Sequence, residues 1–214
     1  MPRMIRPELL DSLSPQHPDA LHNRRDLHLT NRLMGNHRWF ARTLPRHAEP
    51  RERVLEIGAG TGELVIGLAR LGFTVDGLDL WPAPDNWPAG HAWHSGDLRT
   101  FDHFAGYPVI LGNLILHQFT DEELAALGAK WRKHARVILA CEPARRVLSQ
   151  LLFRAAAPLL GANHVSLHDA HVSIDAGFQG DELPRVLGLD DAAWHVKIRT
   201  TALGAYRMIA VRRT

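Results

Sequence analysis

Short apolar runs alternate with longer segments of mixed polarity through the middle of the chain. Five of these runs have the length and composition of buried strands: residues 53–57, 73–80, 92–95, 108–111 and 136–141. Between them, residues 64–71 and 121–134 place apolar side chains at helical spacing, and Asp121 stands near the expected start of its helix. This alternation predicts parallel strands connected by helices.

The last part of the chain has a different pattern. Residues 195–200 and 205–212 are two β-rich runs separated by a short turn at Gly204, which predicts an antiparallel hairpin. With the five earlier runs, the pattern predicts an α/β fold with a mostly parallel seven-stranded sheet. We expect an antiparallel strand in the C-terminal hairpin and helices on both faces of the sheet.

The first fifty residues form a region of their own. Residues 2–18 are punctuated by prolines and are expected to be irregular. A helix is expected from Asp19 as its cap, followed by a second helical piece over residues 36–44. We therefore expect an N-terminal helical cap at 1–50 and a main domain at 51–214.

The composition is that of a folded protein. With 214 residues, 45% hydrophobic and 22% charged, the chain can bury a full core. No apolar stretch approaches the roughly 20 residues that span a bilayer, and no apolar segment of a signal peptide follows the N-terminus. Cys141 is the single cysteine, which suits a reducing compartment. We expect a cytoplasmic protein without a membrane span.

The charges are close to balanced, with a formal net charge of +2. Arginines are frequent in the first fifty residues, and basic residues gather again near the C-terminus at Arg185, Lys197, Arg199, Arg207, Arg212 and Arg213. Such segments can form a nucleic-acid footprint, but they are more often solvated faces. The charge pattern therefore argues against a nucleic-acid partner, and the sequence carries no signal for an oligomeric state.

The segment from Val54 to Gly62 carries the most informative motif. A short strand leads into a turn with glycines at 58, 60 and 62, and glycine lets the backbone pass close to a ligand. The sequence lacks both the third glycine of a dinucleotide fingerprint and the Gly-Lys of a phosphate loop. Glu56, just before the turn, repels a pyrophosphate but attracts a cation.

The spacing of the glycines after Glu56 resembles motif I of the class I S-adenosylmethionine (SAM)-dependent methyltransferases, which have a Rossmann-like fold. The amino and sulfonium groups of SAM are cationic, as this site requires. The resemblance implies cofactor contacts at the following residues: Glu56, Gly58, Ala59, Gly60, Gly62, Asp79, Leu80, Asp97, Leu98 and Asn113.

Acidic residues at the ends of the second and third expected strands match further positions of that family. The resemblance implies that Asp79 accepts hydrogen bonds from the ribose hydroxyls of SAM and that Asp97 accepts one from the adenine amino group. Two alternatives stay open. Asp76 competes with Asp79 for the ribose, and Asp97 can be the cap of a following helix.

The stretch after the fourth expected strand bears on the methyl acceptor. Asn113-Leu-Ile-Leu stands where enzymes that methylate DNA amino groups carry Asp/Asn-Pro-Pro-aromatic. Asn113 and His117 are similar to the N-x-x-x-H stretch of small-molecule methyltransferases of the quinone-biosynthesis type. Residues 31–35 and 163–178 resemble bacterial methyltransferases encoded beside type III polyketide synthases. These resemblances imply a phenolic, quinone-like or polyketide acceptor.

An insert at about residues 143–193 separates the fifth strand from the hairpin. In the family, such inserts and the N-terminal helices cover the cofactor and shape the acceptor pocket, so we expect a lid. Its apolar residues predict an apolar roof: Leu148, Leu151, Leu152, Phe153, Leu159 and Leu160. The alternatives are an RNA methyltransferase, suggested by the basic ends of the chain, and a non-catalytic SAM-binding accessory protein.

Histidines supply the candidates for a general base, because the pKa of imidazole lies near neutrality. His168 is the first choice, His171 the second, and His164 and His117 follow. In an extended segment, His171 shares a face with Asp169 and His168 does not. The alternative interpretation is a surface loop rich in histidine.

The sequence predicts neither a metal site nor a reactive cysteine. The His168–His171 run lacks a third ligand at recognisable spacing, so no metal is expected. Glu142 matches only one of the two carboxylate positions of the metal-dependent catechol methyltransferases. Cys141 stands at a buried strand end and is interpreted as a packing residue.

Overall fold

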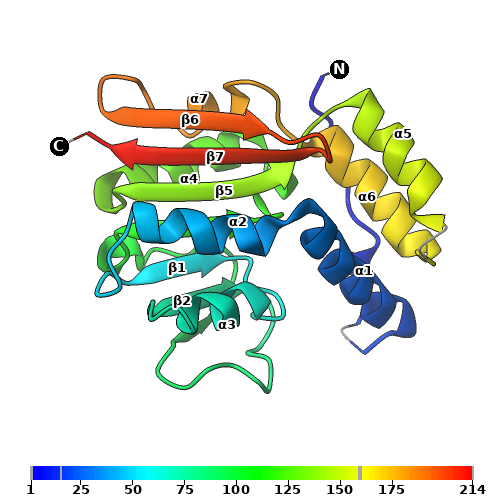
Figure 1. The fold of residues 1–214 in the computed structure, drawn as a ribbon, viewed down its shortest axis with the longest axis horizontal. Helices are drawn as coiled ribbons and strands as arrows, with labels where there is room; N and C mark the ends of the chain where they lie inside the picture. Colours follow the sequence, from blue (N-terminus) through cyan, green and yellow to red (C-terminus); the bar gives the residue numbers. More distant parts are fainter. Residues whose placement is uncertain (1, 15, 159–160, 214) are drawn as a thin grey trace.

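Seven strands form one sheet at the centre of the computed structural model, which describes residues 2–14, 16–158 and 161–213. The strands are β1 (Val54–Ile57), β2 (Val75–Asp79), β3 (Trp93–Ser95), β4 (Val109–Asn113), β5 (Val137–Pro143), β6 (Trp194–Thr200) and β7 (Ala205–Arg212). Their order is β3-β2-β1-β4-β5-β7-β6 (Figure 1). β1 to β5 are parallel, and β7 pairs antiparallel with β5 and β6. The predicted sheet is confirmed.

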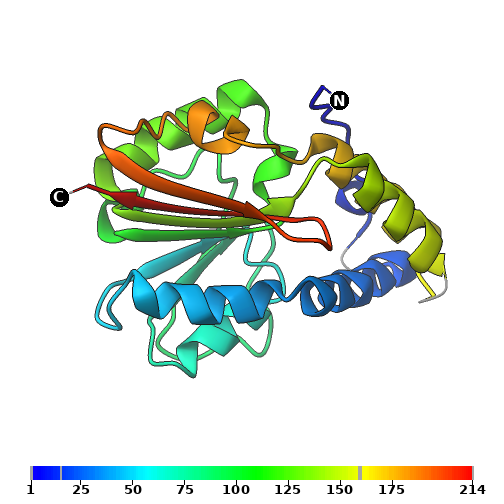
Figure 2. The same cartoon turned by 45° about the horizontal axis from the view of Figure 1, so that its top comes forward.

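Helices surround this sheet on both faces and at one end. They are α1 (Pro18–Met34), α2 (Asn36–Thr43), α3 (Glu63–Ala69), α4 (Asp121–His134), α5 (Val147–Ala156), α6 (His164–Ala176) and α7 (Glu182–Val186). Helices α2 and α3 cover one face, whereas α4 and α7 cover the other. Helices α1, α5 and α6 pack together beyond the carboxyl ends of β4 and β5 (Figures 1 and 2).

Side-chain caps determine where several helices begin. Asn163 caps α6, because its Oδ1 accepts the N–H of Ser166 at 2.9 Å. Helix α1 begins before its predicted cap, Asp19. Its cap is His17, whose Nδ1 accepts the Asp19 N–H at 3.2 Å. Pro18 then occupies the first helical position, where its fixed φ suits the helix and its missing N–H costs nothing.

The extended conformation expected around His168 is wrong. Residues 164–176 form α6, with Val165, Asp169, Val172 and Ala176 buried at spacings of three and four residues. Six of the other nine positions of the helix are histidine, serine or aspartate, so the apolar period is weak in the sequence. Packing of α6 against α1 and α5 supplies the stability that the pattern alone does not.

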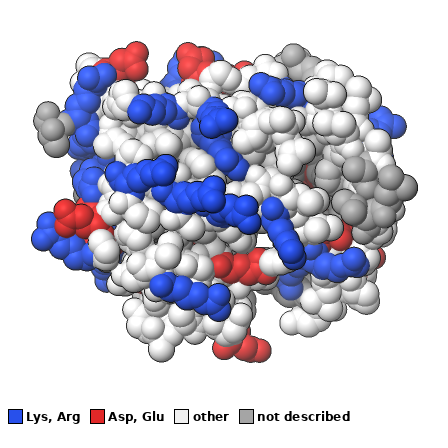
Figure 3. All heavy atoms as spheres, viewed as in Figure 1, with Lys and Arg blue, Asp and Glu red and all other residues white. Residues whose placement is uncertain are grey.

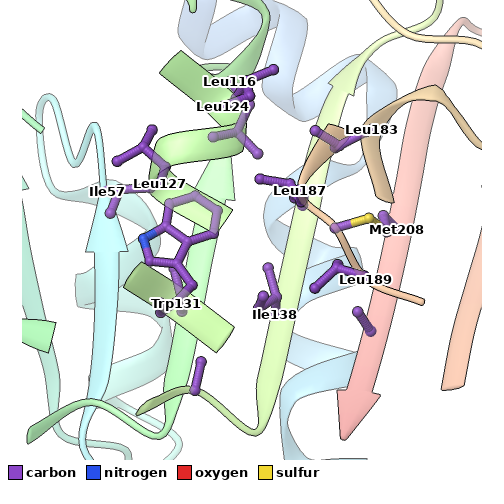
Figure 4. Close-up of a cluster of buried hydrophobic side chains, with 14 of the residues drawn as sticks. Ile57, Leu116, Leu124, Leu127, Trp131, Ile138, Leu183, Leu187, Leu189 and Met208 are labelled. Carbon is purple, nitrogen blue, oxygen red and sulfur yellow. The ribbon is translucent and has the colours of Figure 1, made fainter. Parts of the chain in front are cut away.

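The two faces of the sheet carry separate hydrophobic cores. On one face, α4 buries Trp131 in a cluster that includes Leu187, just after α7, and Met208 of β7 (Figure 4). On the other face, Phe40 of α2 and Leu68 of α3 are fully buried against β1, β4 and β5. Both layers hold the strand ends in fixed positions, which is what a site at the sheet edge requires.

The helices at the end of the sheet keep apolar side chains exposed. These side chains are Leu21, Leu27, Leu33, Val147, Leu148, Leu151 and Leu152. Within the described parts of the chain, no helix combines the length and apolarity needed to cross a bilayer.

Gly128, in the middle of α4, tests how tightly this layer is packed. A Cβ atom at Gly128 would lie 2.3 Å from the backbone oxygen of Leu187. We expect Gly128→Ala to lower the free energy of unfolding by about 1–3 kcal/mol, because the helix must move away. In Gly67→Ala, also within a helix, the new Cβ meets no atom within 4 Å, so we expect a gain of up to about 1 kcal/mol. Urea unfolding measures the stability of both variants. Equal stability of the two would contradict the close contact of Gly128 with Leu187.

Candidate active site

The loop after β1 is shaped by glycines in a left-handed conformation. Gly58, Gly60 and Gly62 have φ values of 65°, 53° and 75°, which side chains rarely tolerate. A Cβ at Gly58 would lie 2.7 Å from the side chain of Ile115, and one at Gly62 would lie 3.0 Å from Trp87. At Gly60 a Cβ would meet no atom within 4 Å. The loop is therefore packed at both ends and open in the middle.

Two carboxylates flank this open position. Glu56 on β1 is 3% exposed, and its Oε2 has no hydrogen-bond partner among the described residues. Asp79 lies at the end of β2, and its Oδ2 accepts the N–H of Gly60 at 2.8 Å. Burial raises the pKa of Glu56 well above its usual range, and the nearby Asp79 raises it further. A bound cation would relieve both effects, since it would supply the missing partner.

The alternative ribose ligand, Asp76, is fully buried and already occupied. It accepts hydrogen bonds from the N–H of Ala92 at 2.7 Å and the hydroxyl of Tyr107 at 2.7 Å, and it pairs with Arg53. These contacts fix the middle of β2 to its neighbours. Asp79, at the open end of the same strand, is only partly buried and accepts the N–H of Trp81 at 3.0 Å besides that of Gly60.

Residues after β3 bring a third carboxylate to the same end of the sheet. Asp97 Oδ1 accepts the N–H of Arg99 at 2.9 Å and pairs with its guanidinium at 3.3 Å. The residues that follow form a turn and not a helix, so Asp97 caps no helix. Leu98 is buried in the core, whereas Leu80 after β2 is 67% exposed.

The end of β4 is strained. Leu114 has a φ of 58°, and it is the one residue other than glycine with a positive φ among those described. Next to it, Asn113 donates from Nδ2 to Asn31 Oδ1 at 3.1 Å, and its own Oδ1 is buried with no partner in the described structure. Asn36 donates to the same Asn31 oxygen at 2.9 Å. This network joins the end of β4 to the junction of α1 and α2.

A buried acid–histidine pair follows directly. Glu142, at the end of β5, accepts the backbone N–H groups of Ile115, Leu116 and His117 at 3.2, 2.9 and 3.3 Å. It also contacts His117 Nδ1 at 2.7 Å. On the other side of the ring, His117 Nε2 lies 3.4 Å from Glu8 Oε1. The sequence interpretation missed Glu8 and the role of Glu142, although an acid at the end of a buried strand is itself a signal.

These contacts decide the charge of the histidine. Burial disfavours the imidazolium, but hydrogen bonds to Glu142 and Glu8 outweigh burial and raise the pKa of His117 to about 9. Burial likewise opposes ionisation of Glu8, but hydrogen bonds from His117, Ser173 and Gln118 lower its pKa below the usual value. At neutral pH, His117 therefore holds the proton, and Glu8 lies beside it as a carboxylate that lines the cavity.

Glu8 reaches the site because the N-terminal strap, residues 3–10, is tied to the turn after β4 and to α6. Arg3 donates to the carbonyl oxygens of Phe119 and Ala176 at 2.6 and 2.8 Å. The N–H groups of Leu9 and Leu10 donate to the Asp169 carboxylate at 2.7 and 3.1 Å. Asp169 therefore serves to hold the strap in place.

A cavity of about 320 Å³ lies between the strap, helices α1, α5 and α6, and the ends of β4 and β5. Its apolar wall includes Leu27, Leu33, Met34, Leu114, Leu152, Phe153, Ile174 and Leu203. Glu8 and His117 line the same cavity. Of the predicted roof, Leu152 and Phe153 reach the cavity, Leu148 and Leu151 are exposed, and Leu159 and Leu160 lie outside the described residues.

The three histidines of α6 lie elsewhere. His164 and His168 are exposed, and none of the three is among the residues that line the cavity. His168 Nδ1 lies 3.0 Å from Asp169, and His171 pairs with Asp175 at 3.7 Å and not with Asp169. The helical period turns the histidines outward and places Ala170, Ser173 and Ile174 toward the cavity. Of the four candidates, the structure brings only His117 to the cavity.

Cys141 is fully buried on β5, where burial raises the pKa of its thiol to about 12. A neutral, enclosed thiol is a packing group, as the sequence interpretation has it. Among the described residues, no cluster of three histidine, cysteine or acidic side chains is placed to hold a metal ion.

Comparisons with known proteins address the fold. Neither protein-family models nor curated protein sequences match the chain. Among solved structures, the plantazolicin methyltransferase BpumL, in complex with S-adenosylhomocysteine (SAH) and a monoazolic desmethylPZN analog, has 11% identity over 95% of this chain and 92% of that chain, with a TM-score of 0.75.

Two further methyltransferases are similar. Human N-acetylserotonin methyltransferase in complex with SAM has 14% identity over 95% of this chain and 61% of that chain, with a TM-score of 0.62. Magnesium protoporphyrin IX methyltransferase from Synechocystis PCC 6803, with bound SAH, has 15% identity over 86% and 83%, with a TM-score of 0.54. At these identities the likeness shows the fold, and the expected Rossmann-like methyltransferase fold is confirmed.

The His117 cluster makes stability depend on pH. Because the pKa of His117 is about 9 when folded and about 6.5 when unfolded, the stabilisation is complete below about pH 6.5 and is lost as the pH rises through about 9. We expect the stability difference between wild type and His117→Gln to shrink by on the order of 2–3 kcal/mol over that range. Denaturant unfolding across the range measures it, with His195→Gln on the exposed side of β6 as the control. A constant difference would refute the buried imidazolium.

Proposed function

We propose that this protein is a SAM-dependent methyltransferase that acts on a small-molecule acceptor. The observation that carries the proposal is Glu56, a buried acid with an unpartnered oxygen beside the open position of a glycine loop. The site favours a ligand that is cationic near the loop and that approaches the backbone closely. SAM has both properties, and solved structures with this fold include complexes with SAM and SAH.

Each cofactor contact has a residue suited to it. Glu56 would hold the cationic amino end, Gly60 would leave room for the backbone approach, and Asp79 would accept hydrogen bonds from the ribose hydroxyls. Asp97, at the end of the next strand, would receive the adenine amino group. When bound, SAM supplies a methyl group on a sulfonium that is already activated for transfer. The protein's task is therefore to orient the acceptor and exclude water.

The cavity supports a small, largely apolar acceptor. Its volume of about 320 Å³ falls in the range of small-molecule sites. Leucine, methionine and phenylalanine side chains form its wall, and the polar groups Glu8 and His117 meet at one side. A phenolic, quinone-like or polyketide compound matches this distribution, with its ring against the wall and its hydroxyl near Glu8.

The proton of the acceptor is taken by Glu8 in this proposal. Its carboxylate is ionised beside the His117 imidazolium, which Glu142 orients from the opposite side. As the acceptor oxygen gains the methyl group, its proton passes to Glu8. This arrangement moves the proposed acid–base role from His168 to the Glu8–His117 pair. It also favours an enzyme over a non-catalytic SAM-binding protein, because an accessory protein has no use for it.

We further propose that two separate segments form the lid. The N-terminal residues 1–50 contribute the strap and α1, whereas α2 packs in the sheet core. The insert at 143–193 contributes α5 and α6, and α6 contacts α1 directly. Closure over the acceptor would therefore depend on the contacts of Asp169 with the strap.

Cofactor binding is tested at Gly60 with a matched glycine as control. Gly60 and Gly72 both have positive φ, 53° and 85°, and a Cβ at either meets no atom within 4 Å. Both alanine variants therefore carry similar backbone strain. We expect Gly60→Ala to weaken SAM binding at least about tenfold and Gly60→Val to abolish it, because each fills the space of the ligand. Gly72→Ala should bind SAM normally in calorimetry. Equal affinities in all variants would defeat the loop assignment.

Catalysis is tested by labelled-methyl transfer to a panel of phenols, quinones and RNA. We expect Glu8→Gln and His117→Gln to keep SAM affinity and lose about 10²–10⁴-fold in turnover. His168→Ala and His171→Ala are the controls and should retain near-normal turnover. Full activity of Glu8→Gln and His117→Gln would show that orientation alone carries the reaction, and methylation of RNA alone would overturn the acceptor class.

A further inference from the structure

A second groove lies between α2 and the β6–β7 edge of the sheet. Its volume is about 800 Å³, and it is lined by Gly35, Arg38, Trp39, Arg42, Thr43, Arg46, His47, Lys197, Ile198, Arg199, Arg207 and Ile209. Figure 3 shows Lys and Arg side chains gathered over α2 and on the β6–β7 side above it. The lining contains six Lys or Arg residues and no acidic residue.

One wall is a row of arginines on α2 and the turn after it. Arg38, Arg42 and Arg46 follow each other at four-residue spacing, and all three are exposed. Side chains at this spacing lie on the same face of a helix, and the row is about 12 Å long. Like charges four residues apart destabilise a helix in the absence of a counterion.

The other wall is the sheet. Lys197 and Arg199 alternate along β6 and so point to the same face, toward α2. Arg199 lies directly opposite Arg207 in the β6–β7 register. Like charges in directly opposed positions of an antiparallel pair are destabilising. The positive charges within each wall therefore repel one another, and the charges of the two walls repel each other.

Carboxylates do not relieve this repulsion. Within the described residues, Arg38, Arg42, Arg46, Lys197 and Arg199 form no ion pair with an acidic side chain. Other cations of the chain do have such partners: Arg53 pairs with Asp76, Arg99 with Glu123 and Arg136 with Glu52.

Arg207 and His47, two further groups of the groove, also form no ion pair with a carboxylate among the described residues. The Arg207 guanidinium bonds the carbonyl oxygens of Met34 and Gly35 and the Cys141 thiol, and its Nε is buried without a hydrogen bond in the described structure. Burial lowers the pKa of His47, and the nearby positive charges of Lys197, Arg46 and Arg136 lower it further. The groove is therefore a concentrated positive field on a chain whose formal net charge is only +2.

We propose that this groove binds a small molecule with two or more adjacent phosphate groups. Arginine matches phosphate because its planar guanidinium donates two parallel hydrogen bonds, and five of the six cations are arginines. The groove volume is that of a small-molecule site and not of an extended surface. Trp39 and Ile209 provide an apolar side for the rest of the ligand.

The groove is separate from the proposed methyl-transfer site but touches its wall. Arg207 donates from Nη2 to the carbonyl oxygens of Met34 and Gly35, at 2.8 and 3.3 Å. Met34 lines the acceptor cavity, and Gly35 lines the groove. An anion that binds Arg207 would therefore contact a side chain that is hydrogen-bonded to the junction between α1 and α2. Phosphate binding in this groove would not require methyl-transfer activity.

Calorimetry of the full chain with tripolyphosphate and with ATP, at about 150 mM salt to screen weak surface contacts, tests the proposal. Both probes are expected to bind. Equal affinity identifies the phosphate chain as the recognised group, and tighter binding of ATP identifies a nucleotide. Arg42→Gln and Arg199→Gln, one from each wall, should each weaken binding about tenfold or more.

The matched control is Arg70→Gln, an exposed arginine after α3 outside the groove. It should bind both probes as wild type does, and circular dichroism should show that all three variants are folded. No binding at this salt concentration, or equal losses in Arg70→Gln, would overturn the proposal. So would tighter binding of a single-stranded oligonucleotide or a polyglutamate peptide with the same dependence on Arg42 and Arg199, because the occupant would then be a macromolecule.

Discussion

The Glu142 carboxylate joins the ends of two neighbouring strands, and the acceptor side of the site depends on it. It stands at the end of β5 and accepts three consecutive backbone N–H groups from the turn after β4. A carboxylate that satisfies several buried donors is held in one position. The turn it holds contains the strained Leu114 at its start and presents His117 toward the cavity. Arg3 donates to the backbone oxygen of His117 at 3.1 Å, so the strap holds the same turn from the other side.

Charge balance explains the difference between the two candidate sites. At the glycine loop, one oxygen of the buried Glu56 lacks a partner among the described residues and a second acid lies close by, so the site favours a cation. In the groove beside α2, arginines face arginines with no carboxylate between them, so the site favours an anion. Both features cost folding free energy, and both costs fall when a ligand of opposite charge binds. The same principle therefore assigns ligands of opposite sign to two parts of one small protein.

The strap and helices α1, α5 and α6 make the cavity a composite of distant segments. Arg3, Leu9 and Leu10 attach the strap to the turn after β4 and to Asp169 of α6. Because Glu8 lies between these attachment points, its position is set by contacts on both sides. Opening of the strap would remove Glu8 from His117 and lower the pKa of the imidazole toward its ordinary value. The position of the strap and the charge state of His117 are thus coupled by geometry.

The sequence by itself determined the features that depend on neighbouring residues. The strands and α4 follow from local apolar periods, and the open glycine loop with Glu56 before it follows from spacing along one strand and turn. Asp79 also follows, because the end of β2 must lie beside that loop in a parallel sheet.

Only the tertiary structure decided the contacts between distant parts of the chain. His117, Glu142 and Glu8 come from the turn after β4, the end of β5 and the strap, and no local pattern links them. The histidines of α6 share a short segment and suggested a site, yet the helix turns them outward. The basic groove likewise needs α2 beside β6 and β7. The physical reason is that burial, charge and hydrogen bonding act between residues that packing brings together, whatever their distance in sequence.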